Sequence, residues 1–303
     1  MEPEATLMGS VWGLVLGTII LRPYFLLFFL TYLAGSTMHL GLMRAILFAI
    51  IGYALAWLSE YSSIHTGIPY GLYNYIETTR GRELWVMGVP FMDSMSFVFL
   101  AYAAYSMALV VIAPIVSSGR MIYLLETKKG RASWGATILG ALFFVYLDII
   151  IDPIALQGRR WFLGQIYHYP HGGAYFGVPL SNFVGWLIVG FLLIRTLQAT
   201  DRFLDVKGVK DRFAGHCRWR HLFGPALYAG VILFNLWVTF SIGEHTMGWA
   251  GVFIVLFPSV LLCQGVRRKL LRGGMDEAVK AHLADFPAVV IPGLSPTKKP
   301  MRG

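Results

Sequence analysis

Two aspartates, Asp148 and Asp152, lie four residues apart in the otherwise apolar stretch 147–153. Side chains at positions i and i+4 share one face of a helix, so these carboxyl groups are expected to lie together. That stretch contains no basic residue. Either the pair bonds to Arg159 or Arg160 in the following loop, or one carboxyl keeps its proton, because burial and a neighbouring like charge both favour the neutral acid. A neutral carboxylic acid is a candidate proton donor.

The same pair also fits a structural role, as an ion pair or a helix-end cap, since Asp152 precedes Pro153 and proline commonly marks a helix stop. Glu60 closes the apolar stretch 41–58 and is followed by tyrosine and two serines. It is a candidate second acid or base across a cavity. The alternative is an interfacial carboxylate in contact with water. An ionisable residue in a membrane helix is a functional-site hypothesis by default.

His168 and His171 form an H-x-x-H pair in an irregular loop. Metal ligation needs further histidine clusters of the kind found in diiron membrane oxygenases, and the other histidines are isolated in the sequence. The sequence therefore predicts no metal site. A hydrogen-bonding or base role for His168 remains open, as does an exposed loop position.

Aromatic and amide side chains surround these groups. The candidate substrate-binding residues are Tyr70, Tyr73, Tyr175, Asn182 and Trp186. One interpretation is the belt of tyrosine and tryptophan found where a membrane meets water. The other is a sleeve for a long, flat, apolar ligand, in which aromatic faces stabilise a cation.

The elements that must position these residues are membrane helices. The chain is 56% hydrophobic with 14% charged residues and a mean hydropathy of +0.62. Soluble domains carry roughly 25% charged residues, and about 20 apolar residues cross a bilayer. We predict an all-α polytopic bundle. Its seven spans are 11–33, 41–58, 93–116, 134–152, 182–197, 222–240 and 248–264. The first span is weak, because Arg22 and Pro23 fall near its middle.

Lysine and arginine concentrate in the 117–133 loop, the 195–221 loop and the segment after 264. Seven spans place these three segments on one side. The positive-inside rule makes that side cytoplasmic, with the N-terminus outside. We therefore attribute the net charge of +9 to basic residues that set the membrane orientation, and not to nucleic-acid binding. Residues 1–272 are predicted to form the transmembrane domain, and 273–303 a mobile cytoplasmic tail.

The 59–92 and 153–181 loops then share the outer face with the candidate carboxylates. They are aromatic and irregular, and such segments enter a membrane bundle only where protein buries them or they line a cavity. The tripeptide Gly-Val-Pro occurs at 88–90 and 177–179, each time before a span, and Gly-Ile-Pro occurs at 67–69. This echo is consistent with an internal repeat.

Several of these motifs resemble the integral-membrane carotenoid biosynthesis family. The resemblance covers roughly residues 40–265 and rests on the segments around Glu60, 66–71, 88–90, Asp148 to Pro153 and, most specifically, 173–186. That family includes carotenoid 1,2-hydratases acting on γ-carotene-type and bisanhydrobacterioruberin-type substrates. It implies cofactor-independent hydration of a terminal C=C bond of an acyclic end group.

Such a reaction protonates one carbon, stabilises a tertiary cation and captures water. Asp152 or Asp148 is the expected acid, and Glu60 or His168 is expected to position the water. The implied partners are a lipid-soluble carotenoid and membrane lipids, with other enzymes of the pathway as candidates. The expected location is a bacterial or archaeal cytoplasmic membrane. The rival interpretations are a proton-coupled transporter, a non-catalytic carotenoid-binding subunit, and an enzyme with another reaction on a similar isoprenoid.

Overall fold

The computed structural model describes residues 10–119, 121–160, 166–210, 217, 219–271 and 275–294. Within them, helices dominate and strands occur only as three two-stranded ladders. The helices are α2 (Val11–Leu21), α3 (Pro23–His39), α4 (Leu42–Thr66), α5 (Phe91–Ile112), α6 (Lys128–Arg131), α7 (Trp134–Ala155), α8 (Leu180–Val206), α9 (Phe223–Ser241), α10 (His245–Leu271) and α11 (Asp276–Asp285). The strands are β1 (Asn74–Tyr75), β2 (Trp85–Val86), β3 (Val89–Pro90), β4 (Ile115–Ser118), β5 (Met121–Leu124) and β6 (Tyr167–His168).

The predicted all-α polytopic bundle is confirmed. In the described part of the chain, six helices are long and apolar enough to cross a membrane, and the bent pair α2–α3 makes a seventh if it counts as one span. The predicted span 11–33 is not one straight helix, since its two parts meet at 95°. Arg22 separates them and Pro23 starts α3, as expected for a residue that cannot continue the preceding helix.

Helix α4 runs eight residues further than the predicted span 41–58, so the segment from Ser59 to Thr66 is helical and not part of an irregular loop. This segment contains neither glycine nor proline to break the helix, and Gly67 ends it with a φ of 79° in the left-handed region that glycine adopts without strain. Glu60 therefore lies on a rigid helix. In α7, Pro153 is tolerated and the helix ends at Ala155 with Leu156 as its C-cap, so the predicted stop at Asp152 was wrong by about one turn.

Arg22 at the bend is buried and bonded to Glu83 of the 67–90 loop. Its Nε and Nη2 donate to the two Glu83 oxygens at 3.0 and 2.8 Å. Such a paired, two-point contact offsets the desolvation of both charges. Gly17 allows the same loop to approach α2, because a Cβ there would lie 1.8 Å from the Arg82 carbonyl oxygen. This contact closes one end of the bundle.

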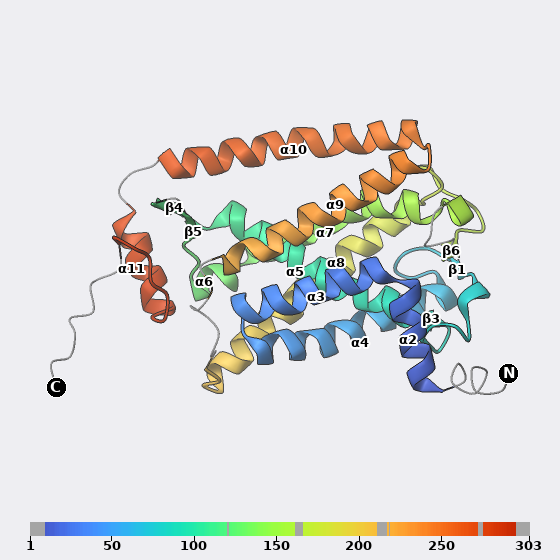
Figure 1. Cartoon of the computed structure of the whole chain (residues 1–303), viewed down its shortest axis with the longest axis horizontal. Coiled ribbons are helices and arrows are strands. Elements are labelled where there is room, and N and C mark those ends of the chain that lie inside the picture. Colours follow the sequence, from blue (N-terminus) through green and yellow to red (C-terminus); the bar gives the residue numbers. More distant parts are fainter. Residues whose placement is uncertain are drawn as a thin grey trace.

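Helix α5 occupies the centre and packs against α3, α4, α7, α8 and α9, whereas α10 lies along the edge of the bundle (Figure 1). Figure 1 shows the β1–β6 ladder, β3 and α2 at one end and β4, β5, α6 and α11 at the other. We call the first the cavity end and the second the basic end. The three basic segments of the sequence map to the basic end, although Arg120 and much of 211–218 lie outside the described residues.

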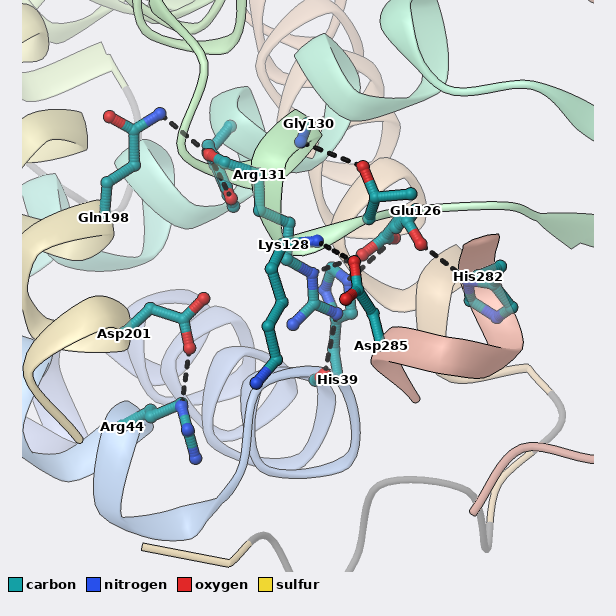
Figure 2. A network of polar contacts seen from close by, with 12 residues as sticks. His39, Arg44, Glu126, Lys128, Gly130, Arg131, Gln198, Asp201, His282 and Asp285 are labelled. Atoms are coloured by element: carbon teal, nitrogen blue, oxygen red, sulfur yellow. Dashed lines mark hydrogen bonds and ion pairs between the residues drawn. The ribbon is translucent and has the colours of Figure 1, made fainter. Parts of the chain in front are cut away.

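A buried ion network organises the basic end (Figure 2). Glu126 accepts hydrogen bonds from His39 Nε2 at 2.9 Å and from Arg131 Nε at 2.6 Å. Arg44 donates to Asp201 and Asp205 of α8 at 2.5 Å each. The Glu126 contacts join α3 to the loop that connects α5 and α7, and the Arg44 contacts join α4 to α8.

The described part of the predicted tail, 275–294, packs against this network. His282 Nδ1 lies 2.6 Å from the Glu126 carbonyl oxygen, and Asp285 accepts from the Lys128 backbone N–H at 2.8 Å. Val279 and Ile291 are buried beside Tyr123 and Leu125. Residues 273, 274 and 295–303 of the predicted tail lie outside the described residues.

Candidate functional site

A cavity of about 110 Å³ lies at the cavity end between α3, α4, α5, α7, α8 and α9. By this measure a buried water needs on the order of 10–15 Å³, so the cavity has room for several waters. Its polar lining comprises Tyr24, Glu60, Tyr70, Tyr73, Tyr75, Asp93, Ser96, Asp152, Tyr167, Tyr169, Asn182 and Asn235. Of the residues that the sequence predicted, this set includes Glu60, Asp152, Tyr70, Tyr73 and Asn182, and Trp186 joins them in the apolar lining.

One polar cluster centres on Glu60 of α4. The Tyr75 hydroxyl oxygen lies 2.9 Å from Glu60 Oε1 and 2.7 Å from Asp93 Oδ2, and Ser94 donates to the second Glu60 oxygen. Asp93 and Ser94 belong to the first turn of α5. Glu60 is buried, with 2% of its surface exposed, so the interfacial carboxylate in water that the sequence also allowed is not what the structure shows.

The second cluster centres on Asp152 of α7. Its Oδ1 accepts a hydrogen bond from Tyr167 at 2.6 Å, and Asn182 Nδ2 lies 2.7 Å from both Asp152 Oδ2 and Asp148 Oδ2. Asp148 and Asp152 therefore share one helix face, as predicted. Asp148 is fully buried behind the cavity, and its Oδ1 has no hydrogen-bond partner among the described residues.

An ion pair between the aspartates and Arg160, one of the two alternatives that the sequence left open, is absent from the described contacts. Arg160 instead bonds to Glu244, in the link between α9 and α10. The Arg159 side chain lies outside the described residues. An asparagine and a tyrosine thus neighbour the two aspartates where the sequence suggested an arginine.

The β1–β6 ladder caps the cavity and explains the position of His168. Asn74 pairs with His168 and Tyr75 with Tyr167 in antiparallel register. Successive side chains of a strand point to opposite faces, so Tyr75 and Tyr167 face the cavity while Asn74 and His168 are exposed. His168 therefore does not line the cavity, and His171 is exposed as well.

Trp186 and Tyr70 form the aromatic wall on the α8 side. Trp186 stacks on Phe97 at 4.6 Å and contacts Phe144 at the same distance. The Tyr70 hydroxyl lies 2.8 Å from Ser59 Oγ. Gly185 lets the 67–70 segment approach α8, since a Cβ there would lie 2.7 Å from the Pro69 carbonyl oxygen.

Tyr175, the remaining predicted binding residue, lies outside the cavity lining. It contacts Phe176 and Phe183 at the turn that precedes α8. Its β-bridge to Val178 closes that turn, so the observed contacts of Tyr175 are structural.

Away from the carboxyl groups, the cavity lining becomes apolar. Phe25 and Phe28 of α3, Phe99 of α5 and Phe234 of α9 form this arm. Phe28 packs edge-on against Phe234 at 5.6 Å. The cavity therefore has a polar part that carries the carboxyl groups and an apolar arm lined by α3, α5 and α9.

The tyrosines of the cap are hydrogen-bond donors over a wide pH range. Burial raises the pKa of Tyr75 well above its usual value, and the charges of Asp93 and Glu60 add to the effect. Burial also raises the pKa of Tyr167, with a further contribution from Asp152. A phenol that keeps its proton can support a neighbouring carboxylate or a developing negative charge.

From the sequence, Tyr75, Tyr167 and Tyr169 counted only toward the aromatic excess of the outer face and Asp93 only as a residue at a helix start, so none of the four was a candidate catalytic or substrate-binding residue. A usable signal was present: Tyr75 follows Glu60 by 15 residues, and Tyr167 follows Asp152 by the same number. No group of three or more His, Cys, Asp and Glu side chains among the described residues is arranged to hold a metal ion.

A second cleft, of about 620 Å³, lies between α10 and the α5, α7 and α9 helices. Its described lining is almost entirely apolar and includes no carboxyl group. Lys269, at its edge, donates to the carbonyl oxygens of Val110, Val111 and Ala113 at the end of α5. Among the pockets lined by described residues, only the one at the cavity end combines carboxyl groups with an apolar arm.

The fold and cavity define an all-α, membrane-embedded protein whose polar site is enclosed by its own helices and loops. Residues 9–258 match the family described as carotenoid biosynthesis protein. That match covers most of the chain, so the protein belongs to this family and takes part in carotenoid biosynthesis. No curated protein and no solved structure matches the chain.

Proposed function

We propose that this protein hydrates a terminal C=C bond of an acyclic carotenoid end group. The observation that carries the proposal is the composition of one cavity, whose lining combines carboxyl groups with an arm of phenylalanine side chains. A polyene end group is apolar and would bind in the arm. Its terminal double bond would then meet the acids, and no group in this scheme has to change its oxidation state.

The reaction has three steps. A cavity carboxyl donates its proton to one alkene carbon, and the π electron pair forms the new C–H bond. The tertiary cation that remains is stabilised by the electron-rich faces of Trp186, Tyr70 and Tyr73. A cavity water adds to the cation and gives its proton to a second carboxyl. The product is a tertiary alcohol, and the conjugated chain is unchanged.

The substrate would approach from the lipid, because the apolar arm runs between α3 and α9. Phe28 and Phe234 contact each other on that route, so their side chains would have to move apart to admit the substrate. We also propose that the basic end faces the cytoplasm, by the positive-inside rule. The cavity would then lie near the outer surface of the membrane.

The deciding experiment is expression in a carotenoid-free bacterial host that makes lycopene or γ-carotene. Chromatography with mass detection should show a pigment heavier by one water, with unchanged visible absorption. A variant with Glu60→Gln and Asp152→Asn should leave the pigment unmodified, while Glu77→Gln, on an exposed carboxylate outside the cavity, should not.

Two results would overturn the proposal. Unmodified pigment that co-purifies with folded wild-type protein would indicate a non-catalytic carotenoid-binding subunit. A pigment with another change in mass would indicate a different reaction on the same class of substrate.

A further inference from the structure

Two segments of the chain repeat one arrangement of residues. In each, a helix carries a carboxyl group near its end, and a tyrosine 15 residues later bonds to that carboxyl: Glu60 with Tyr75, and Asp152 with Tyr167. A tight turn follows in both copies. Its two central residues have positive φ, 48° and 85° at 87–88 and 48° and 88° at 176–177. The repeated Gly-Val-Pro tripeptide is therefore part of a longer structural repeat that includes the carboxyl group, the tyrosine and the turn.

The repeat continues into the next helix. Pro90 and Pro179 are the N-caps of α5 and α8. Three residues after the proline come Asp93 and Asn182, and both line the cavity. Seven residues after it come Phe97 and Trp186, which stack on each other at 4.6 Å.

Equivalent residues of the two copies contact each other, which is what a two-fold axis between them requires. Phe97 meets Trp186, and Tyr75 pairs with Tyr167 across an antiparallel ladder. The units α4–β1–α5 and α7–β6–α8 therefore form two halves that meet at the cavity, and α3 and α9 complete its lining. The first half delivers Glu60 and Asp93, which share Tyr75, and the second half delivers Asp152, which is bonded to Tyr167.

The halves differ in their hydrogen-bond donors. In the first, the Tyr75 oxygen contacts both Glu60 and Asp93, yet a phenol has only one proton to give. The second contact is a hydrogen bond only if one of the two carboxyls carries a proton. This half therefore holds an acidic proton inside the cavity.

In the second half, Asp152 receives two donors. Tyr167 bonds to one of its oxygens and the Asn182 amide to the other. Donors on both oxygens favour the ionised carboxylate. Glu60 also has a donor on each oxygen, Tyr75 and Ser94, but it shares Tyr75 with Asp93, whereas the Tyr167 hydroxyl bonds to Asp152 alone among the described carboxyl groups. Asp148, which shares the Asn182 amide, lies behind Asp152 and does not line the cavity.

From this asymmetry we infer that the first half is the acid and the second half the base. The Glu60–Asp93 pair protonates the alkene carbon, and the π electrons form that C–H bond. Water adds to the cation, and its proton passes to Asp152. Asp152 then releases this proton to water while the Glu60–Asp93 pair takes one up, so each turnover consumes one water. Tyr75, Tyr167 and Asn182 are positioning residues.

This assignment reverses the roles expected from the sequence, and it rests on the proposed hydration. It predicts different defects in the two halves. Without its base, the enzyme still forms the cation, which can only lose a proton and return to an alkene. In deuterated water the recovered substrate then carries deuterium. Without its acid, no cation forms and the substrate stays unlabelled.

The test uses membranes with the full-length protein, lycopene or γ-carotene as substrate, deuterated water, and mass spectrometry of recovered pigment. Asp152→Asn should lower hydration by at least about 100-fold and leave deuterium in unhydrated substrate. Glu60→Gln and Asp93→Asn should show neither hydration nor label. Glu77→Gln is the matched control, since its carboxylate is exposed and outside the cavity.

Should Asp152→Asn fail to fold, Tyr167→Phe and Tyr75→Phe supply the same comparison with milder changes. Label without hydration in the Tyr75 variant and not in the Tyr167 variant would overturn the assignment, as would identical behaviour of the two halves in folded protein. A wild-type protein that neither hydrates nor labels the substrate would refute the proposed function itself. Hydration by the wild type with the wrong pattern in the variants refutes only the division of roles.

Discussion

Tyr75 and Tyr167 lie opposite each other in the β1–β6 ladder, and their hydroxyl groups contact carboxyl groups on different helices. Tyr75 reaches Glu60 of α4 and Asp93 of α5, whereas Tyr167 reaches Asp152 of α7. A ladder of two residue pairs thus ties three membrane helices together at the cavity.

Replacing either of these tyrosines with phenylalanine should lower the hydration rate by roughly 10- to 100-fold. A hydrogen bond to a charged group contributes about 1.5–3 kcal/mol, and each 1.36 kcal/mol changes a rate about tenfold. Initial rates in membranes, normalised to folded protein, measure the effect. Tyr123→Phe is the control, because Tyr123 is buried at the basic end and its hydroxyl has no partner among the described residues. Equal hydration rates in all three variants would show that the hydroxyl groups of Tyr75 and Tyr167 do not contribute to the reaction.

Gly185 predicts a steric effect on the aromatic wall. A Cβ there would lie 2.6 Å from the Tyr70 ring and 2.7 Å from the Pro69 carbonyl oxygen. Gly185→Ala should therefore destabilise the protein by about 1–3 kcal/mol, as overpacking does, and lower activity by moving Tyr70. Gly230→Ala is the matched change, since a methyl group added at this position of α9 would have nothing within 4 Å. In detergent, the unfolding temperature of Gly185→Ala should be below that of the wild type, and the unfolding temperature of Gly230→Ala should equal or exceed it. A higher unfolding temperature for Gly185→Ala than for Gly230→Ala would contradict the close approach of the 67–70 segment to Gly185.

The bend at Arg22 depends on its buried partner Glu83. Removing one member leaves the other charge buried without its counter-ion, which destabilises by about 3–5 kcal/mol. Arg22→Met and Glu83→Leu alone should therefore each lower the unfolding temperature. The double variant should recover most of the loss, because neither charge then remains. A double variant as unstable as the sum of the single ones would show that the pair is not the main contact of either residue.

The sequence predicted the bundle well because hydropathy alone marks membrane helices. The six spans after the bend appear as helices, with ends displaced by up to nine residues. Helix ends were missed where the chain stays helical outside the apolar stretch, as from Ser59 to Thr66. The Arg22–Glu83 pair was not anticipated, since the two residues are 61 positions apart and nothing local connects them.

For the site, the sequence pattern identified ionisable residues that are unusual in apolar helices. Glu60, Asp148 and Asp152 stand out among apolar neighbours, and the structure brings Glu60 and Asp152 into one cavity. Loop residues were harder to place. His168 and Tyr167 are neighbours in the sequence, but strand register alone decides that the tyrosine faces the cavity and the histidine faces outward. A two-residue strand leaves too little periodicity to reveal this beforehand.

At the basic end, the contact between α11 and the ion network should weaken as the pH falls. Burial lowers the pKa of His282 from its usual 6.5, and the charges of Arg220 and Arg131 lower it further, against an opposing effect of Glu126. A histidine with a lowered pKa binds fewer protons in the folded state than in the unfolded state. Its contribution to stability is therefore complete above about pH 6.5 and declines as the pH falls towards its folded-state value.

Glu126 does not add to this change, because His39 and Arg131 outweigh its burial and hold its pKa well below the usual value. Hydrogen–deuterium exchange of 276–285, corrected for the intrinsic rate, should show constant protection above about pH 6.5 and falling protection below it. His282→Gln keeps an N–H donor for the Glu126 carbonyl but cannot titrate, so its protection should change much less. An equal loss of protection in this variant would assign the titration to another group, with His39 the nearest candidate because it also contacts Glu126.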